Sequence, residues 1–319
     1  MGSILWLDPT QSRPMAIMSD AGRVSRARCR QVACTAETLD LTHALWPKKY
    51  FKPLISPCEH PFHLGPLTVR FHHAGHLLGG ALVAIEVQGA RVLHAPTFEL
   101  NGDRDLEPAI PRKADVLLLG SALGDPEIHI PDAATLQESV RDFLNDALIR
   151  GEVPLIATDE LGVVRELTRF LRSEEMPFRI HPRLHRFLGA YERLGLPSVR
   201  GLRGVPAETP GPIVWPLELL EAGQLPAIPH MRTLALTARA ATQTGRQELA
   251  VDRAIPWTHQ PTHGALVEFV RGVDPDQVIV LEGQDEALTQ SLIDLGFRAR
   301  SLRTGRQIPL WPSRGSASK

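Results

Sequence analysis

Cysteine is scarce in this sequence, and long apolar runs are missing from it. The 319 residues include three cysteines, Cys29, Cys34 and Cys58, without a C-x-x-C spacing. An odd number in this arrangement excludes a disulfide framework and a structural zinc ribbon, and it predicts reduced thiols. No run approaches the roughly 20 apolar residues that span a bilayer. Residues 1–8 also lack the basic head and apolar stretch of a signal peptide, so we expect a cytoplasmic chain without membrane contact.

An excess of charge of either sign is absent as well. The chain has 35 Lys and Arg against 36 Asp and Glu, a formal net charge of -1. Overall charge therefore gives no reason to expect nucleic-acid binding, and only a local patch could supply one. The length and the 43% of hydrophobic residues suffice for a large core or for two lobes that share one interface.

The order of apolar residues predicts strands and helices that follow one another along the chain. Short alternating or continuous apolar runs predict strands at 67–71, 81–87, 91–94, 115–119, 153–157, 277–281 and 298–302. Apolar residues at spacings of three and four predict helices at 133–149, 161–172, 181–194, from 264 to 270, and 286–295. Asp132 is a candidate N-cap, and residues 201–229 are rich in Pro and Gly. This succession is typical of an α/β protein.

A glycine turn between two of the expected strands is the most informative stretch: Phe71-His72-His73-Ala74-Gly75-His76-Leu77-Leu78-Gly79-Gly80-Ala81. It resembles the Ala-Gly-His-x-x-Gly-Ser-Ala turn of the β-CASP nucleases, the metallo-β-lactamase-fold branch that includes ribonuclease J and the mRNA 3′-end processing factors. Short bacterial exonuclease-like members associated with DNA ligase are the most similar. The resemblance continues in order through Leu7-Asp8-Pro9, Ala36-Glu37-Thr38-Leu39, Leu161-Gly162-x-x-Arg165-Glu166 and Val278-Ile279-Val280-Leu281-Glu282-Gly283.

The resemblance implies a fold and a domain organisation. The fold is α/β, a metallo-β-lactamase αβ/βα four-layer sandwich with an inserted β-CASP-like α/β domain. Residues 1–125 and 241–319 form the metallo-β-lactamase-like domain, and residues 126–240 form the insert.

The resemblance also implies where two catalytic zinc ions would bind, and this sequence has lost most of those ligands. The motif and acid positions fall on Ser19, Ala21, Arg23, Val24, Thr97, Gly120 and Glu282. His76 and His259 remain as vestigial motif histidines. Two imidazoles cannot hold a dinuclear zinc site, and Arg23 introduces a positive charge where a dication would lie. We therefore expect no metal, no other cofactor and no intact catalytic residue.

A rearranged metal site is the alternative. His72, His76, His94, His259 and His263 could bind zinc in another geometry and support an active metal-dependent exonuclease or phosphodiesterase, acting on RNA or DNA. Asp20 and His73 are further candidates, although neighbouring strand residues such as His72 and His73 face opposite sides of a sheet. The simpler interpretation is a set of polar histidines that remain from an abandoned site.

Arginines accumulate near the former metal motif, at Arg23, Arg26, Arg28 and Arg30. A second group occurs near the end, at Arg298, Arg300, Arg303 and Arg306. Guanidinium groups bind phosphate oxygens in pairs, so the first group is the candidate nucleic-acid-binding surface, and a solvated charged face is its alternative. The adjacent acids Asp159 and Glu160 are expected to be surface charges.

The predicted function is that of a pseudonuclease. It would bind single-stranded nucleic acid in the cleft between its lobes, or dock on a helicase, a ligase or an active nuclease homologue, without hydrolysis.

Overall fold

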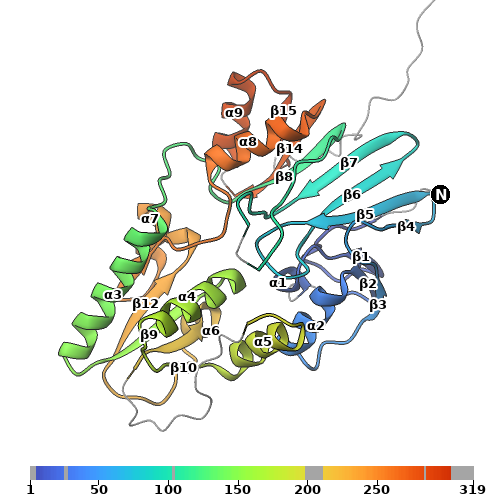
Figure 1. Ribbon diagram of the computed structural model, residues 1–319. Coiled ribbons are helices and arrows are strands. Elements are labelled where there is room, and N and C mark those ends of the chain that lie inside the picture. Colours follow the sequence, from blue (N-terminus) through green and yellow to red (C-terminus); the bar gives the residue numbers. More distant parts are fainter. Residues whose placement is uncertain (1–4, 25–27, 103–104, 198–210, 284, 303–319) are drawn as a thin grey trace, which may run out of the picture.

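Three sheets organise the chain (Figure 1). The computed structural model describes residues 5–24, 28–102, 105–197, 211–283 and 285–302, without the side chains of Val24 and Glu282. Across these ranges the fold is mixed α/β, as the hydrophobic pattern predicts. No helix in them is long and apolar enough to cross a membrane.

The largest sheet has seven strands in the order β15-β14-β8-β7-β6-β5-β4. Its antiparallel part is a meander of β4 (Pro61–Leu64), β5 (Leu67–His73), β6 (Ala81–Val87) and β7 (Ala90–Ala95). Its parallel part joins β7 to β8 (Val116–Ser121), β14 (Gln277–Gly283) and β15 (Ala299–Ser301).

A small parallel sheet of β1 (Met15–Ile17), β2 (Gln31–Cys34) and β3 (Lys52–Ile55) packs on this large sheet. Ile17 and Ala33 meet Phe71 of the large sheet in one buried cluster. Each sheet therefore has one face buried against the other.

Helices cover the outer faces of these two sheets. On the large sheet lie α8 (His263–Val273) and α9 (Asp285–Asp294), and Phe269 of α8 stacks on Phe98 with ring centroids 4.1 Å apart. On the small sheet lies α2 (Ala36–Leu45), whose Leu39 packs against the cluster of Met18 and Val32. The four layers are thus helix, sheet, sheet and helix, with the short helix α1 (Ala21–Val24) at the inner edge.

The third sheet is five-stranded and parallel, in the order β10-β11-β9-β12-β13. Its strands are β9 (Val153–Thr158), β10 (Arg179–Ile180), β11 (Ile213–Pro216), β12 (Met231–Leu236) and β13 (Arg253–Ile255). Because successive strand residues face opposite sides, Ile156 packs under α3 (Ala133–Ile149), α4 (Leu161–Ser173) and α5 (Pro182–Arg193). Leu155 faces α6 (Leu217–Glu221) and the residue that follows α7 (Gln243–Glu248), and η1 (Ala238–Ala241) connects β12 to α7.

The division at residues 125 and 240 stays a prediction. β13, at Arg253–Ile255, pairs with β12 and so belongs to the five-stranded sheet although it follows residue 240. The five-stranded sheet as a whole is inserted in sequence between β8 and β14 of the large sheet.

Several predicted elements are confirmed at nearly the predicted bounds. Helix α3 covers 133–149, and the Asp132 side chain accepts a hydrogen bond from the Thr135 backbone N–H at 2.8 Å. The Pro- and Gly-rich stretch 201–229 contains β11 and α6, two elements that the hydrophobic pattern does not predict. Pro212 precedes β11 and Pro216 is its last residue, so the strand offers only three residues, Ile213 to Trp215, to a pattern search.

One continuous apolar cluster joins the small sheet's helices to α5. Leu41 and Leu45 of α2 are buried with Leu184 and Phe187 of α5. The Arg186 side chain also donates a hydrogen bond to a backbone carbonyl of α2, at 3.0 Å. This contact fixes the five-stranded part against the edge of the two packed sheets, where the candidate site lies.

Candidate functional site

A pocket of about 130 Å³ lies where the small and large sheets meet the N-terminus of α4. It is lined by both vestigial histidines, His76 and His259, together with Arg23 and Asp20. A side chain at Gly162, in the first turn of α4, would lie 3.0 Å from His76 O and 3.2 Å from His259 Cγ. Tertiary structure therefore brings the two histidines to the same point although 183 positions of sequence separate their numbers.

The loop that carries His76 is held by the start of α2. Gly79 has φ +71°, and a Cβ there would lie 2.6 Å from Thr35 Oγ1, so a larger residue would be strained. The Gly79 carbonyl accepts hydrogen bonds from the hydroxyls of Thr35 and Thr38, at 2.8 and 2.9 Å. The Leu78 N–H donates to the Tyr191 hydroxyl of α5 at 3.1 Å. The backbone geometry at Gly79 and the contacts with α2 and α5 explain why this turn requires a specific sequence.

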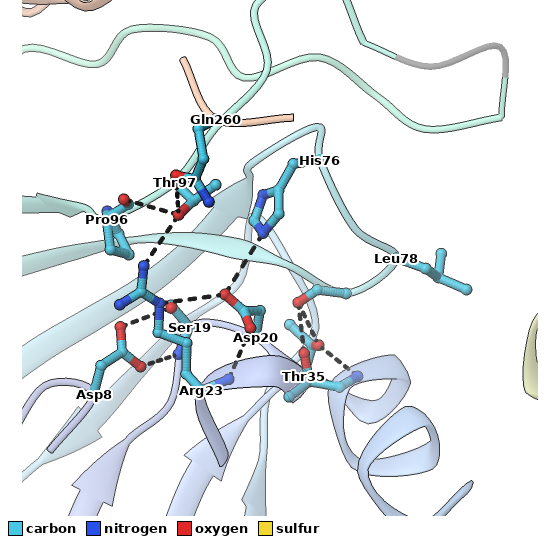
Figure 2. A network of polar contacts seen from close by, with 12 residues as sticks. Asp8, Ser19, Asp20, Arg23, Thr35, His76, Leu78, Pro96, Thr97 and Gln260 are labelled. Atoms are coloured by element: carbon cyan, nitrogen blue, oxygen red, sulfur yellow. Dashed lines mark hydrogen bonds and ion pairs between the residues drawn. The ribbon is translucent and has the colours of Figure 1, made fainter. Parts of the chain in front are cut away.

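Asp20 lies between a guanidinium and an imidazole (Figure 2). One carboxylate oxygen is 3.6 Å from Arg23 Nε and 3.5 Å from His76 Nε2, and the other accepts the Arg23 backbone N–H at 3.0 Å. Burial alone would raise the pKa of Asp20, but the hydrogen bond and charge of His76 and the charge of Arg23 hold it far below its usual range. Asp20 is therefore a buried carboxylate whose charge is balanced from within the protein.

The Arg23 guanidinium continues this network to the large sheet. Its Nη2 donates to Thr97 Oγ1 at 3.0 Å. The Thr97 hydroxyl is 2.9 Å from the Pro96 carbonyl and 3.4 Å from Gln260 Oε1, and it can donate to one of them at a time. Figure 2 shows the Arg23 side chain between Asp20 and Thr97, so it links the α1 end of the network to the end of β7.

Asp8 forms a second buried group beside the first. It accepts the Ser19 N–H at 2.8 Å and the Ser19 hydroxyl at 2.7 Å, and His94 Nε2 lies 2.9 Å from the same carboxylate. Burial would raise the pKa of Asp8, but His94 and Arg23 lower it overall. His94 Nδ1 is buried without a hydrogen-bond partner in the described part of the chain.

Two further positions that the resemblance assigns to the metal motif have structural contacts. Ala21 is fully buried in the apolar cluster of α2 and α5. Gly120 lies where β8 passes the β7 end so closely that a Cβ would overlap the Pro96 carbonyl oxygen, which leaves no space for a carboxylate. The side chains of Val24 and Glu282 lie outside the described residues.

His259 is bound to acids of α4 and the turn before it. Its Nε2 donates to Glu166 Oε2 at 2.9 Å, and Trp257 Nε1 donates to the same oxygen at 2.6 Å. Burial would lower the pKa of His259, but Glu166, Glu160 and Glu99 raise it overall. The expectation of a surface charge at Glu160 is wrong: it is half-buried, and it accepts the His259 N–H at 2.8 Å because the 257–260 turn folds over it.

The five histidines of the alternative metal site each contact a different partner residue. His72 Nδ1 lies 2.8 Å from Glu59, and His263 Nε2 lies 2.7 Å from Ser291 of α9. His76, His94 and His259 each contact a different carboxylate, as described above. Within the described ranges, no group of three or more His, Cys, Asp or Glu side chains is placed to hold a metal ion.

The described arginines of the predicted nucleic-acid surface do not all line the same pocket. Arg23 lines the pocket, whereas Arg28 and Arg30 are exposed and lie outside its lining. Arg26 lies outside the described residues. In the second arginine group Arg298 is exposed and Arg300 half-buried, and the remaining two members lie outside the described residues.

Asp8, Glu166 and Gln260 belong to the site but had not been singled out as site residues. Asp8 and Glu166 lie in two of the segments that carry the family resemblance, Leu7-Asp8-Pro9 and Arg165-Glu166, and Gln260 follows His259 directly. Their position next to residues of a recognised motif is the sequence signal that could have identified these polar residues as part of the site.

Comparisons with known proteins place the chain among distant relatives that act on nucleic acids. No profile of a known protein family matches it. It is 24% identical over 310 residues to a probable DNA ligase of Opitutus terrae, covering 96% of this chain and 30% of that protein. It is 24% identical over 176 residues to an RNase J-like protein of Methanocaldococcus jannaschii, covering 50% of this chain and 42% of that protein.

A shorter match is to endoribonuclease YSH1 of Yarrowia lipolytica, 30% identical over 118 residues, which is 36% of this chain and 14% of that protein. The chain thus spans less than half the length of each of these relatives. By sequence it is similar, at low identity, to proteins named as ribonucleases and as a DNA ligase.

Proposed function

We propose that this chain is a catalytically degenerate homologue of the β-CASP nucleases that serves a nucleic-acid-processing partner without hydrolysing phosphodiesters. The helix-sheet-sheet-helix layers and the parallel α/β part inserted between β8 and β14 support a metallo-β-lactamase sandwich with a β-CASP-like insert. The ribonuclease names of two relatives support the same assignment.

The observation that carries the proposal is the Arg23 side chain in the pocket. A dication about 4 Å from its guanidinium would be repelled by about 8 kcal/mol at an effective dielectric constant near 20. Asp20, the carboxylate that would attract such an ion, is already paired with Arg23 and His76. The residues present therefore do not fit a dinuclear zinc centre, and no reaction step is assigned to a metal here.

The partner is proposed from the relatives. Almost the whole chain matches within 30% of a protein named probable DNA ligase. The segment homologous to this chain is part of a protein named as a ligase. This supports a role in which this chain docks on a separate ligase, a helicase or an active nuclease homologue.

Direct binding of single-stranded nucleic acid is the second candidate. The exposure of Arg28 and Arg30 favours it, because exposed guanidinium groups can reach phosphates. The carboxylates beside Arg23 oppose it within the pocket itself.

Metal analysis paired with nuclease assays tests the proposal. Purified protein is expected to contain no stoichiometric zinc or manganese and to leave single-stranded DNA and RNA uncut when either metal is added. Stoichiometric metal together with cleavage abolished by His76→Ala would overturn it, and would support the rearranged metal site instead.

A salt titration tests the second candidate. If a strand binds, Arg28→Ala and Arg30→Ala should each reduce the slope of log affinity against log salt by about 1. Arg91→Ala, an exposed arginine on the far hairpin, is the matched control. Absence of oligonucleotide binding at low salt would leave the protein-partner role.

A further inference from the structure

Basic residues gather at one edge of the small sheet, where the amino ends of its parallel strands meet. We call this set the basic edge, and its members are Arg13, Arg28, Arg30, Lys48, Lys49 and Lys52. The Arg30 N–H donates to the Arg13 carbonyl at 3.2 Å, and the Lys52 N–H donates to the Arg30 carbonyl at 2.9 Å. These bonds place three basic residues next to one another, at the starts of β1, β2 and β3.

The loop between α2 and β3 brings further cations to the basic edge. The Lys49 N–H donates to the Trp46 carbonyl at 2.9 Å, in the turn that precedes β3. Burial lowers the pKa of Lys49, and the nearby charge of Arg28 lowers it further. Two like charges are thus close enough to repel each other, and a bound anion would relieve that repulsion.

Acidic residues are scarce in the segments that form the basic edge. The single acid between residues 9 and 36 is Asp20, which lines the pocket at the other end of β1, and residues 41–58 contain none. Glu37 and Asp40 of α2 lie in its first half, whereas its end adjoins the edge. Four exposed members form no ion pair with any described residue: Arg28, Arg30, Lys48 and Lys52. The described part of the chain therefore leaves this positive surface without a counter-charge.

Aromatic rings accompany these cations. Tyr50 is 91% exposed and lies between Lys49 and Lys52 in the sequence. Trp6 is also exposed, and the Arg13 guanidinium lies 3.8 Å from the centroid of its ring. An exposed ring among cations can stack on a nucleic-acid base while the cations bind phosphates. An acidic peptide would use the charges but would leave the Tyr50 ring without a stacking partner.

We infer that the basic edge binds single-stranded nucleic acid, with phosphates on Arg28, Arg30 and Lys52 and a base stacked on Tyr50. This rests on the second candidate function and gives it a site of its own. Strand β1 runs from the basic edge to the pocket, since Asp20 follows its carboxyl end. A strand bound at the edge therefore stays outside the pocket, whose carboxylates oppose binding.

Fluorescence anisotropy on the 319-residue chain tests the inference. The probes are labelled oligothymidylate and oligouridylate of about twelve nucleotides, and EDTA in the buffer prevents metal-dependent cleavage. Both strands are expected to bind, because phosphate and stacking contacts need no 2′-hydroxyl. Their affinity should fall steeply between about 50 and 200 mM salt. A polyglutamate peptide is expected to bind more weakly, because it has no ring to stack on Tyr50.

Variants of exposed residues locate the contacts. Tyr50→Ala should weaken strand binding about fivefold or more, whereas Tyr50→Phe keeps the ring and should bind as the wild type does. Arg28→Ala and Lys52→Ala should each weaken it about two- to fivefold and reduce its salt dependence. Lys113→Ala, at an exposed lysine that pairs with Asp274 outside the basic edge, is the matched control and should change nothing. An unchanged melting transition verifies that each variant is folded.

Three results would overturn the inference. Absence of strand binding at about 50 mM salt would refute the second candidate function as well. Binding that responds equally to Lys52→Ala and Lys113→Ala would refute only the site. Polyglutamate that binds more tightly than either strand would assign the basic edge to an acidic protein segment. Metal-dependent cleavage, measured without EDTA, would refute the proposed loss of hydrolysis and leave strand binding measurable, so these failures are distinguishable.

Discussion

Replacing Arg23 by Gln tests whether the guanidinium is the structural counter-ion of the buried Asp20 carboxylate in the pocket. The change removes the positive charge 3.6 Å from Asp20, whose side chain is 8% exposed. Gln can still reach Thr97 but cannot neutralise a carboxylate. Asp20 would keep the His76 imidazole as a neighbour, with Nε2 3.5 Å away.

The magnitude follows from the geometry of the pair. Coulomb attraction at 3.6 Å with an effective dielectric constant near 20 is about 4–5 kcal/mol. The Arg23 side chain is 24% exposed, and burying both charges has its own desolvation cost, so the net loss is smaller. We expect the free energy of unfolding to fall by about 1–3 kcal/mol at pH 7.

The loss should depend on pH in one direction. The folded pKa of Asp20 lies far below the unfolded value of 3.8. The stabilisation is therefore fully present above about pH 4 and is lost as the pH falls below that value towards the folded pKa. The difference between wild type and Arg23→Gln should shrink when the pH is lowered from 7 to about 3.5.

Urea denaturation at pH 7, 5 and 3.5 measures this difference. Arg91→Gln is the matched control, because Arg91 and Asp115 form an ion pair at 2.8 Å on the surface, worth less than about 1 kcal/mol. Equal effects of the two substitutions at pH 7, or a loss that grows as the pH falls, would refute a structural counter-ion at Arg23.

Two further outcomes follow from the packing and the charges of the site. Gly120→Ala should lower the free energy of unfolding by about 3 kcal/mol or more, because the new Cβ overlaps the Pro96 carbonyl, whereas Gly264→Ala has open space and should be neutral in the same urea assay. Glu166→Gln should lower the pKa of His259 in an NMR titration, since Glu166 is the main group that raises it. Its stability cost should be largest below about pH 6.5 and should decline as the pH rises through the raised folded pKa of His259; an unchanged His259 pKa would contradict the assignment.

Elements with a long apolar pattern could be predicted, including the buried strands β8 and β9, and strands with only a few consecutive apolar residues could not. Helix α3 has an amphipathic spacing and an Asp cap, and its bounds agree with the prediction. The central strand β12 was not predicted, because its apolar run Leu234-Ala235-Leu236 has three residues and follows the polar pair Arg232-Thr233. Runs of four or more apolar residues are the ones that indicate a buried strand.

The sequence by itself determined the chemical character of the positions that the resemblance assigns to a metal site. Ser19, Ala21, Arg23 and Thr97 stand where the resemblance places metal-binding or acid-base groups, and those identities can be read without coordinates. The glycine turn around His76 could also be recognised from the sequence, because only a few residue types tolerate its backbone geometry.

Tertiary structure alone decided which of these residues meet. It brought His76 and His259 to Gly162, placed Arg23 against Thr97, and separated Arg28 from the pocket. It also gathered acids from segments far apart in sequence around the pocket, where Asp20 lies near Asp159 and Glu160, while the net charge of the chain stayed near zero. Charge balance is summed over the whole sequence, but Coulomb forces fall with distance and act only between groups that the fold places side by side.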